Sequence, residues 1–256
     1  MAEKAGANPD LGTGTVDQAE IAQFGRIAGD WWDPNGLFKP LHQMNPLRLG
    51  HIRDQVVAHF DRDGASLTPF SGLRIVDVGC GGGLLSEPIC RLGAQVTGID
   101  AGEEGVEVAK SHAKAMGLEI DYRVETAEDL AASGETYDVV LALEIIEHVA
   151  EIDQFVAALA DLTSPGGLVF LSTLNRTRRS YLSAIVAGEY VLRWLPRGTH
   201  DWRKFVRPSE LAAQLRGNGL DVQDISGMIY NPVRGSWSLS RRDLAVNYIA
   251  VASKAN

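Results

Sequence analysis

Two acidic side chains and an imidazole stand close together in the sequence at Glu144, Glu147 and His148. They follow an apolar run that predicts a strand, so we expect them at the sheet edge where α/β proteins bind ligands. If this turn is helical, all three share a face and could hold Mg²⁺ or a similar ion with open positions for substrate oxygens. His148 could instead act as a metal-free general base, and acidic residues also favour a helix start without further function. The sequence leaves these three interpretations open.

A glycine-rich segment is the second candidate site. Residues Asp77 to Gly83 join a predicted strand to a predicted helix and read Asp-Val-Gly-Cys-Gly-Gly-Gly. Glycine adopts positive φ and lets a ligand approach the main chain, which we expect at Gly79 and Gly81. Asp100 ends the next predicted strand, where a carboxylate can bind both hydroxyls of a ribose. The pattern predicts a cofactor that contains a ribose.

Two positions bear on the kind of cofactor. A dinucleotide fingerprint has glycine at its first, third and sixth positions, but the sixth position here is Leu84. Asp77 also places a negative charge before the loop, which is unfavourable for a pyrophosphate and favourable for a cationic amino acid group. We therefore expect a cofactor with an ammonium group, and a nicotinamide dinucleotide is the alternative.

A helix start is predicted further upstream. Asn45-Pro46 has the form of an N-cap followed by proline at the first helical position, and the helix should run to about residue 60. Arg48 would then lie in the first turn, where the helix dipole disfavours a cation. Its presence there suggests a binding function, and an ordinary surface arginine is the alternative.

Alternating apolar runs and amphipathic segments predict an α/β fold. We expect a Rossmann-like, seven-stranded, mostly parallel sheet with helices on both faces, N-terminal helices and a helical insertion after the fifth strand. Residues 1–14 should be disordered, and 15–256 should form one domain that includes an N-terminal helical cap (15–60) and a basic amphipathic insertion (175–207). The expected strands are 73–78, 95–99, 120–124, 138–143, 168–172, 220–225 and 246–252, and the expected helices include 16–32, 84–92, 103–116, 152–162 and 208–216.

Composition excludes several classes of protein. The formal net charge of -9 disfavours nucleic-acid binding. The two cysteines, Cys80 and Cys90, imply no disulfide framework. The first 20 residues have no secretory or transit signal, and no run of 18 apolar residues could span a membrane. We expect a cytoplasmic enzyme.

Residues 176–207 form a basic segment in this acidic chain. It contains eight basic residues and two acidic ones, which gives it a charge of +6. Between the basic clusters, residues 181–195 are mostly apolar with aromatic ends, which suits a helix lying on an anionic membrane surface. A lid packed on the active site is the alternative. The first interpretation predicts peripheral association with the inner face of a bacterial membrane.

Several segments resemble a known family. The loop Asp77–Gly83 with the acid at Asp100 resembles motif I of the class I S-adenosylmethionine (SAM) methyltransferases, and Tyr137–Leu143 resembles their fourth strand. The resemblance to the ubiquinone biosynthesis O-methyltransferases runs from about residue 17 to 252. It depends on the combination of Trp31–Asp33, Phe38–His42, Asn45–Arg48, Ser172–Arg176, Gly198–Asp201 and Tyr230–Pro232.

This resemblance implies a SAM site and assigns its residues. Arg48 would contact the carboxylate of the cofactor, and Leu143 would border the cofactor at the end of its strand. Residues 125–129 would pass near the adenine. The cofactor-binding residues expected from the loop and the resemblance together are Arg48, Asp77, Gly79, Gly81, Asp100 and Leu143.

The implied reaction is in-line transfer of a methyl group to a phenolic hydroxyl of a polyprenyl catechol or demethylubiquinol. A phenol has a pKa of about 10, so the reaction needs a base or a metal at neutral pH. The resemblance implies Glu144 and His148 as catalytic residues and Glu144, Glu147 and His148 as ligands of Mg²⁺ or a similar ion. Expected partners are an anionic membrane and, in addition, other ubiquinone-biosynthesis enzymes. The alternatives are another small aromatic substrate, a nicotinamide oxidoreductase, or a non-catalytic membrane-associated scaffold.

Overall fold

The computed structural model describes residues 18–182 and 202–256. The expected disorder of residues 1–14 lies outside these residues. So does most of the basic insertion, because only its flanks at 175–182 and 202–207 are described.

One mixed sheet forms the centre of the molecule, with eight strands in the described residues and the order β3-β2-β1-β4-β5-β8-β6-β7. The first five strands run parallel, whereas β8 is antiparallel to both β5 and β6. The strands are β1 (Arg74–Val78), β2 (Gln95–Asp100), β3 (Asp121–Val124), β4 (Tyr137–Leu143), β5 (Thr163–Leu174), β6 (Leu220–Asn231), β7 (Ser236–Ser240) and β8 (Asn247–Lys254).

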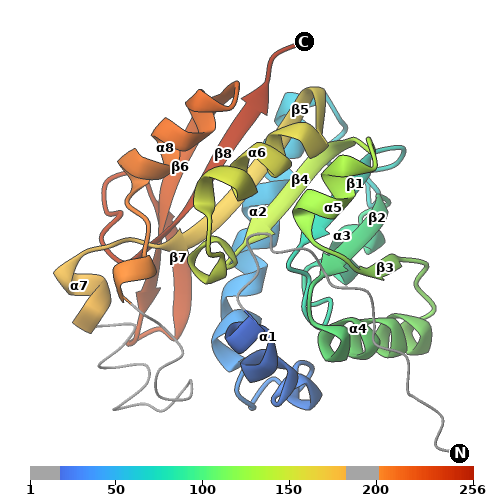
Figure 1. The fold of residues 1–256 in the computed structure, drawn as a ribbon, viewed down its shortest axis with the longest axis horizontal. Helices are drawn as coiled ribbons and strands as arrows, with labels where there is room; N and C mark the ends of the chain where they lie inside the picture. Colours follow the sequence, from blue (N-terminus) through green and yellow to red (C-terminus); the bar gives the residue numbers. More distant parts are fainter. Residues whose placement is uncertain (1–17, 183–201) are drawn as a thin grey trace, which may run out of the picture.

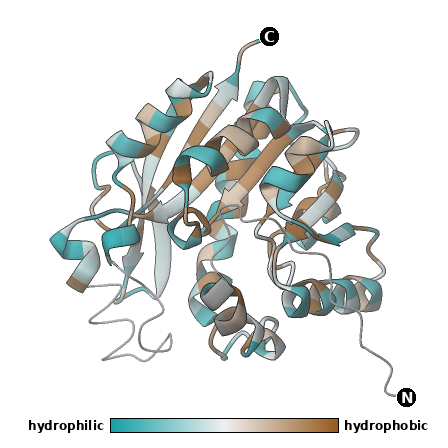
Figure 2. Ribbon diagram, in the orientation of Figure 1, coloured by the Kyte–Doolittle hydropathy of each residue, from teal (hydrophilic) through white to brown (hydrophobic). Residues whose placement is uncertain are grey.

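The central strands are apolar on both faces because helices cover both faces. Side chains alternate, so Ile75 and Leu141 pack into one layer while Val76 and Val140 pack into the other. Figure 2 shows the apolar residues concentrated in these strands. One layer contains α2 (Lys39–His59) and α3 (Ser86–Arg91), and the other contains α5 (Ala127–Ala132), α6 (Ile152–Leu162) and α8 (Pro208–Gly217), of which α6 and α8 cross the near face in Figure 1.

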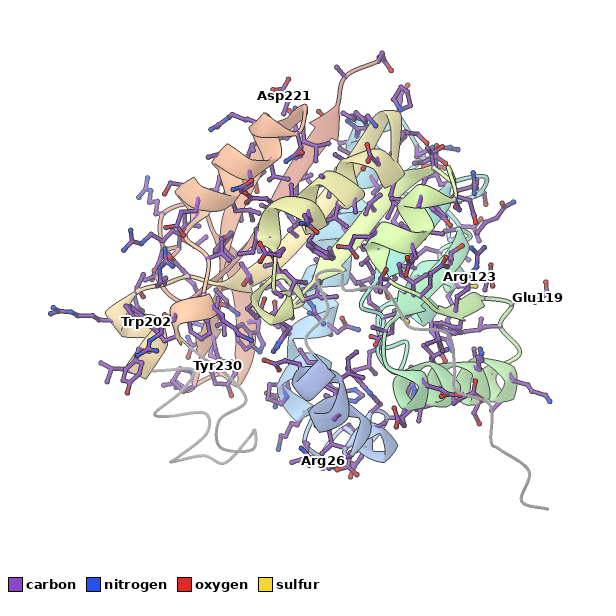
Figure 3. The ribbon with its side chains drawn as sticks, viewed as in Figure 1. Arg26, Glu119, Arg123, Trp202, Asp221 and Tyr230 are labelled. Carbon is purple, nitrogen blue, oxygen red and sulfur yellow. The ribbon has the colours of Figure 1, made fainter. Side chains whose placement is uncertain are left out.

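The predicted Rossmann-like class is correct, but the prediction of seven strands is wrong. The additional strand is β7, which pairs with β6 at the edge of the sheet. It is short and its side chains are partly or fully exposed, so it lacks the apolar run that marks a buried strand. In Figure 3, Tyr230 and Trp202 lie toward this end of the sheet, and Arg123 and Glu119 lie toward the opposite end, beside β3.

The second N-terminal helix does not begin where Asn45-Pro46 predicts. Helix α2 starts at Lys39, with Pro40 in its first turn and Pro46 in its interior. Asn45 does not cap the helix, because its side-chain amide donates a 2.7 Å hydrogen bond to the carbonyl of Leu84. Arg48 therefore lies in the middle of the helix, and the dipole argument for its function was wrong.

The first N-terminal helix is shorter than the apolar spacing predicts. In place of a helix over 16–32, the described chain has α1 (Gln18–Gly25) and a 3₁₀ turn at Ala28–Asp30. Helix α4 (Glu103–Met116) matches its predicted bounds and ends at Gly117, whose φ is 69°. Among the described helices, none has the length and apolarity needed to cross a membrane.

Candidate active site

The glycine-rich loop joins β1 to α3 and turns back beneath the N-terminal cap. Gly79 and Gly81 have φ of 73° and 49°, which favour glycine. A Cβ at Gly79 would lie 2.3 Å from Ile145, and one at Gly81 would lie 2.3 Å from the Trp31 ring. These two positions therefore require glycine for both backbone conformation and space.

Trp31 lies directly on this loop and is held there from two sides. Its indole stacks on Phe38 with ring centroids 3.8 Å apart and an interplanar angle of 8°. The neighbouring Trp32 donates a 2.9 Å hydrogen bond from Nε1 to the Gly82 carbonyl. The cap thus forms one wall of the candidate site, which local sequence patterns did not indicate.

Asp100, at the end of β2, faces the same loop. Its two carboxylate oxygens each accept a backbone hydrogen bond, from Gly81 at 2.9 Å and from Gly102 at 2.8 Å. Burial raises the pKa of Asp100, and these two N–H groups oppose the rise. A carboxylate has about four acceptor positions, so the remaining ones suit two ribose hydroxyls.

Asp77 and Arg48 place opposite charges in the buried part of the site. Burial raises the pKa of Asp77 to about 6, although a 2.5 Å hydrogen bond from Ser86 and the charge of Arg48 oppose the rise. The Arg48 guanidinium donates from Nη2 to Asn45 at 2.9 Å, but its Nε is buried and has no hydrogen-bond partner in the described chain. Neither the Asp77 carboxylate nor the Arg48 guanidinium is fully paired within the residues that the structure describes. They suit, respectively, the ammonium and the carboxylate of a bound amino acid group.

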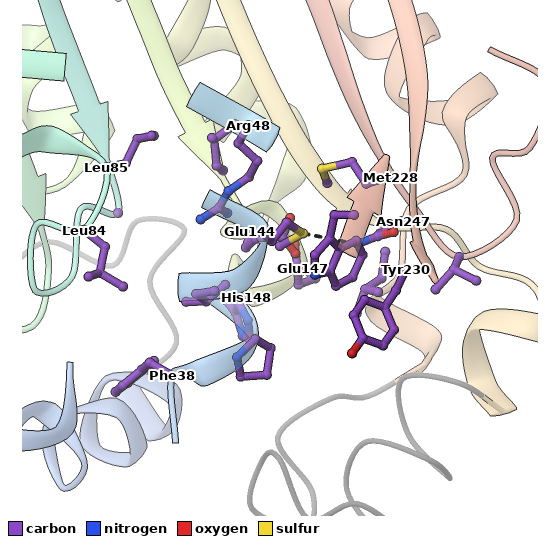
Figure 4. Close-up of a pocket in the computed structure, with 18 of the residues that line it drawn as sticks. Phe38, Arg48, Leu84, Leu85, Glu144, Glu147, His148, Met228, Tyr230 and Asn247 are labelled. Atoms are coloured by element: carbon purple, nitrogen blue, oxygen red, sulfur yellow. Dashed lines mark hydrogen bonds between the residues drawn. The ribbon is translucent and has the colours of Figure 1, made fainter. Parts of the chain in front are cut away.

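Two cavities meet between the cap and the carboxyl-end edge of the sheet. The smaller, of about 170 Å³, is lined by Gly81, Asp100 and Thr126. The larger, of about 510 Å³, is lined by Arg48, Asp77 and a mostly apolar wall toward β6 and β7. Figure 4 shows Arg48, Glu144, Glu147 and His148 between the loop-side residues Leu84 and Leu85 and the strand residues Met228 and Tyr230. The residues that line both cavities are Phe24, Trp31, Gly79, Glu144 and His148.

His148 lies at this junction and contacts a carboxylate from the cap. Its Nδ1 is 3.1 Å from Glu20 Oε2, and the other Glu20 oxygen accepts a hydrogen bond from Lys204 at 3.1 Å. Burial lowers the pKa of His148, but the charges and hydrogen bond of Glu20 and Glu147 outweigh burial and raise it overall. Sequence patterns missed Glu20 and Lys204, because both are remote from His148 along the chain.

The two glutamates beside His148 are bound to adjacent hydroxyl groups of β5. Ser172 donates to Glu144 at 2.6 Å and Thr173 donates to Glu147 at 2.8 Å. Glu144 has a φ of 56° and precedes a 3₁₀ turn at Ile146–His148, so the condition of one helical turn through all three residues is not met. The residues still gather at one cavity, as the sequence predicts.

Comparisons with known proteins identify the family. Residues 49–225 match a methyltransferase domain. The ubiquinone biosynthesis O-methyltransferase of Cereibacter sphaeroides is 55% identical over 240 residues, which cover 94% of this chain and 97% of that protein. That of Chelativorans sp. is 52% identical over 246 residues, with 96% and 97% covered.

The chain belongs to the ubiquinone biosynthesis O-methyltransferase family. It is a SAM-dependent methyltransferase, as the sequence predicts. The magnesium protoporphyrin IX methyltransferase of Synechocystis PCC 6803, solved with bound SAM, shares its fold. That structure has a TM-score of 0.64 and 19% identity, and the match covers 97% of this chain and all of the other.

The arrangement in this methyltransferase fits SAM but does not form a metal site. The loop, Asp100 and the Asp77–Arg48 pair offer the groups that a ribose and a zwitterionic amino acid require. In contrast, no group of three His, Cys, Asp or Glu side chains in residues 18–182 and 202–256 is arranged to hold a metal ion. Glu144, Glu147 and His148 are not such a group, and each is hydrogen-bonded to a separate partner.

The described flanks of the basic insertion are partly neutralised. Arg179 lies 2.9 Å from Asp243, and both Arg176 and Arg207 pair with Glu210. These partly exposed pairs contribute little stability, but they reduce the positive charge that the flanks present at the surface.

Proposed function

We propose that the enzyme methylates a phenolic hydroxyl of a polyprenyl catechol or demethylubiquinol intermediate. The observation that carries this proposal is the junction of the two cavities, where His148 lies between a polar cradle and a largely apolar chamber of about 510 Å³. The relatives are ubiquinone biosynthesis O-methyltransferases, and an apolar chamber suits a ring with a prenyl tail.

We assign the residues around the two cavities to the parts of SAM that their positions and charges suit. Asp100 binds the ribose hydroxyls, with Gly79 and Gly81 allowing close approach. Asp77 binds the ammonium group and Arg48 the carboxylate, and Leu143 packs beside them. When bound, SAM supplies an electrophilic methyl group on its sulfonium.

His148 acts as the general base. Its Nδ1 is held by Glu20, so Nε2 takes the proton of the substrate hydroxyl. The carboxylates of Glu20 and Glu147 stabilise the imidazolium that results. Glu144 lines the same junction and bounds the position in which the substrate oxygen lies in line with the methyl group. The apolar wall excludes water from the phenolate.

Magnesium has no step in this proposal. A divalent ion at this junction would require Glu144, Glu147 and His148 to move into a common coordination sphere, which the described residues do not form. This rearrangement is tested with substrate present. Turnover is compared before chelation, after chelation, and after Mg²⁺ is restored.

Membrane association is the second part of the proposal. Tyr181 and Leu182 are 46% and 60% exposed beside the basic flank, and a polyprenyl substrate resides in a membrane. Sedimentation with liposomes rich in anionic lipid should be weakened by the double substitution Tyr181→Ser and Leu182→Ser. The matched control is Leu67→Ser, because Leu67 is 90% exposed elsewhere. Equal retention of all three proteins would refute this part.

The activity itself is tested with labelled SAM and short-chain polyprenyl catechols. The proposal predicts transfer of label to one hydroxyl oxygen of the ring. Transfer to carbon or nitrogen, or turnover restricted to aromatic compounds without a prenyl tail, would refute the proposed substrate.

A further inference from the structure

Two buried polar atoms in the larger cavity have no hydrogen-bond partner in the described parts of the chain. They are Oδ1 of Asn247 and Nε1 of Trp237. Asn247 is 5% exposed. Most buried polar atoms are paired, since burial removes the water that would otherwise bind them. An unpaired acceptor and an unpaired donor in one cavity therefore point to a ligand that pairs with them.

The register of the sheet places both side chains on the wall of the chamber. Asn247 of β8 pairs with Met228 of β6, and Trp237 of β7 pairs with Tyr230 of β6. Met228 and Tyr230 are two residues apart, so all four side chains lie on the same face. Strand β6 separates the other two strands, and the two pairs are offset by two residues along it, which puts Asn247 and Trp237 about 12 Å apart on this face.

Asn247 is the nearer of the two to the reacting end. It pairs with Leu174 of the neighbouring strand β5. Leu174 follows Thr173, and the hydroxyl of Thr173 donates to Glu147. The amide nitrogen of Asn247 lies 3.5 Å from the sulfur of Met44 on α2, and the dashed line in Figure 4 marks this contact. That contact fixes the amide and leaves Oδ1 as the group presented to a ligand.

We infer that Asn247 selects catechols over monophenols. Its Oδ1 accepts a hydrogen bond from the hydroxyl adjacent to the one that is methylated, and Trp237 Nε1 donates to an oxygen substituent farther along the ring. The prenyl tail cannot pair with either atom, so the ring lies against this wall. The inference rests on the proposed function, because it requires a substrate with adjacent hydroxyl groups.

The test compares two substrates with the same short prenyl tail, one a catechol and the other the matching monophenol. Asn247→Leu should lower kcat/KM for the catechol by about tenfold or more, because leucine leaves the adjacent hydroxyl of the bound catechol without an acceptor. The value for the monophenol should stay within about twofold. Asn247→Asp retains an acceptor and should retain the preference for the catechol.

Two controls separate recognition from folding. SAM affinity by calorimetry should be unchanged in Asn247→Leu, and Asn247→Ala gives the same comparison if the leucine variant does not bind SAM. Asn218→Ala, at the end of α8 and outside the residues that line the cavity, should leave both substrates unaffected.

An unchanged ratio of catechol to monophenol turnover in Asn247→Leu or Asn247→Ala would overturn the inference while the proposed function stands. Failure of the unmodified enzyme to methylate either compound would instead refute the proposed function on which the inference rests.

Discussion

His148 Nδ1 lies 3.1 Å from Glu20 Oε2, although 128 positions separate the two residues in the sequence. One belongs to the turn after β4 and the other to the N-terminal helix α1. Lys204, in the second flank of the basic insertion, binds the same carboxylate. The orientation of the His148 imidazole, the proposed base, therefore depends on two segments outside the central sheet.

Glu20→Gln should lower turnover and shift its pH dependence. The hydrogen bond and charge of Glu20 raise the pKa of His148, so its loss lowers that pKa. His148 then stays neutral down to a lower pH, so the acid limb of the kcat/KM profile moves to lower pH. Because the base is weaker and less well oriented, turnover at the plateau should fall by roughly 10²-fold. A pH–rate profile with labelled SAM measures both effects.

Lys204→Met provides the opposite shift as a control. The charge of Lys204 lowers the pKa of His148, so its removal should move the acid limb to higher pH. If both variants moved the limb in the same direction, the assignment of His148 as the titrating base would be wrong.

The buried carboxylate of Asp77 should make SAM binding depend on pH. Burial raises the pKa of Asp77 to about 6 in the free protein, and a bound ammonium group would favour the ionised form. Binding must then release a proton as the pH falls below about 6, so affinity should decrease there. Arg48 and Asp100 act on the same carboxylate with opposite signs. Calorimetry between pH 5 and 8 measures the effect.

Asp77→Asn should stabilise the free protein and weaken SAM binding. Burial raises the pKa of Asp77 in the folded protein from its ordinary value of 3.8 to about 6, so the free protein loses stability as the pH rises between these two values. Asparagine removes the charge, and the free energy of unfolding at pH 7 should rise by about 1–3 kcal/mol. SAM affinity should fall by roughly tenfold or more and lose its dependence on pH near 6. A variant that kept this pH dependence would rule out Asp77 as its source.

Gly81→Ala should impair SAM binding by displacing Trp31. The new Cβ would lie 2.3 Å from the indole, at a φ of 49°. Gly134→Ala is a matched control, since Gly134 has a φ of 79° but no described atom lies within 4 Å of the added Cβ. The control should lose about 1–2 kcal/mol through backbone strain and bind SAM normally. Equal SAM affinity in the two variants would show that the contact with Trp31 is unimportant.

Magnesium should bind weakly to the enzyme without substrate. The described residues offer no group of three suitable side chains, and Mg²⁺ requires near-octahedral oxygen coordination. Titration with MgCl₂ should show no saturable site tighter than about 1 mM. A micromolar site that disappears in Glu147→Gln would contradict the arrangement described for these side chains.

The parts of the site that follow local rules were predicted well. Strand, glycine turn and helix signal the loop around Gly79, and Asp100 follows at the end of the next strand. Buried strands such as β4 are continuous apolar runs. These features depend on residues that are close in sequence, so their patterns are visible without the fold.

The features that depend on tertiary contacts were missed or misread. Asn45 has the form of an N-cap, but its side chain binds the Leu84 carbonyl and the helix begins at Lys39. Strand β7 is too exposed to show a buried-strand pattern. Glu20 reaches the candidate site through a contact with His148 that no local spacing encodes.

The most direct test of the account is a single-turnover measurement with His148→Ala, a short-chain polyprenyl catechol and labelled SAM. The account predicts that the variant binds SAM with unchanged affinity and transfers the methyl group at least about 10²-fold more slowly than the unmodified enzyme. Near-normal transfer by His148→Ala would contradict it.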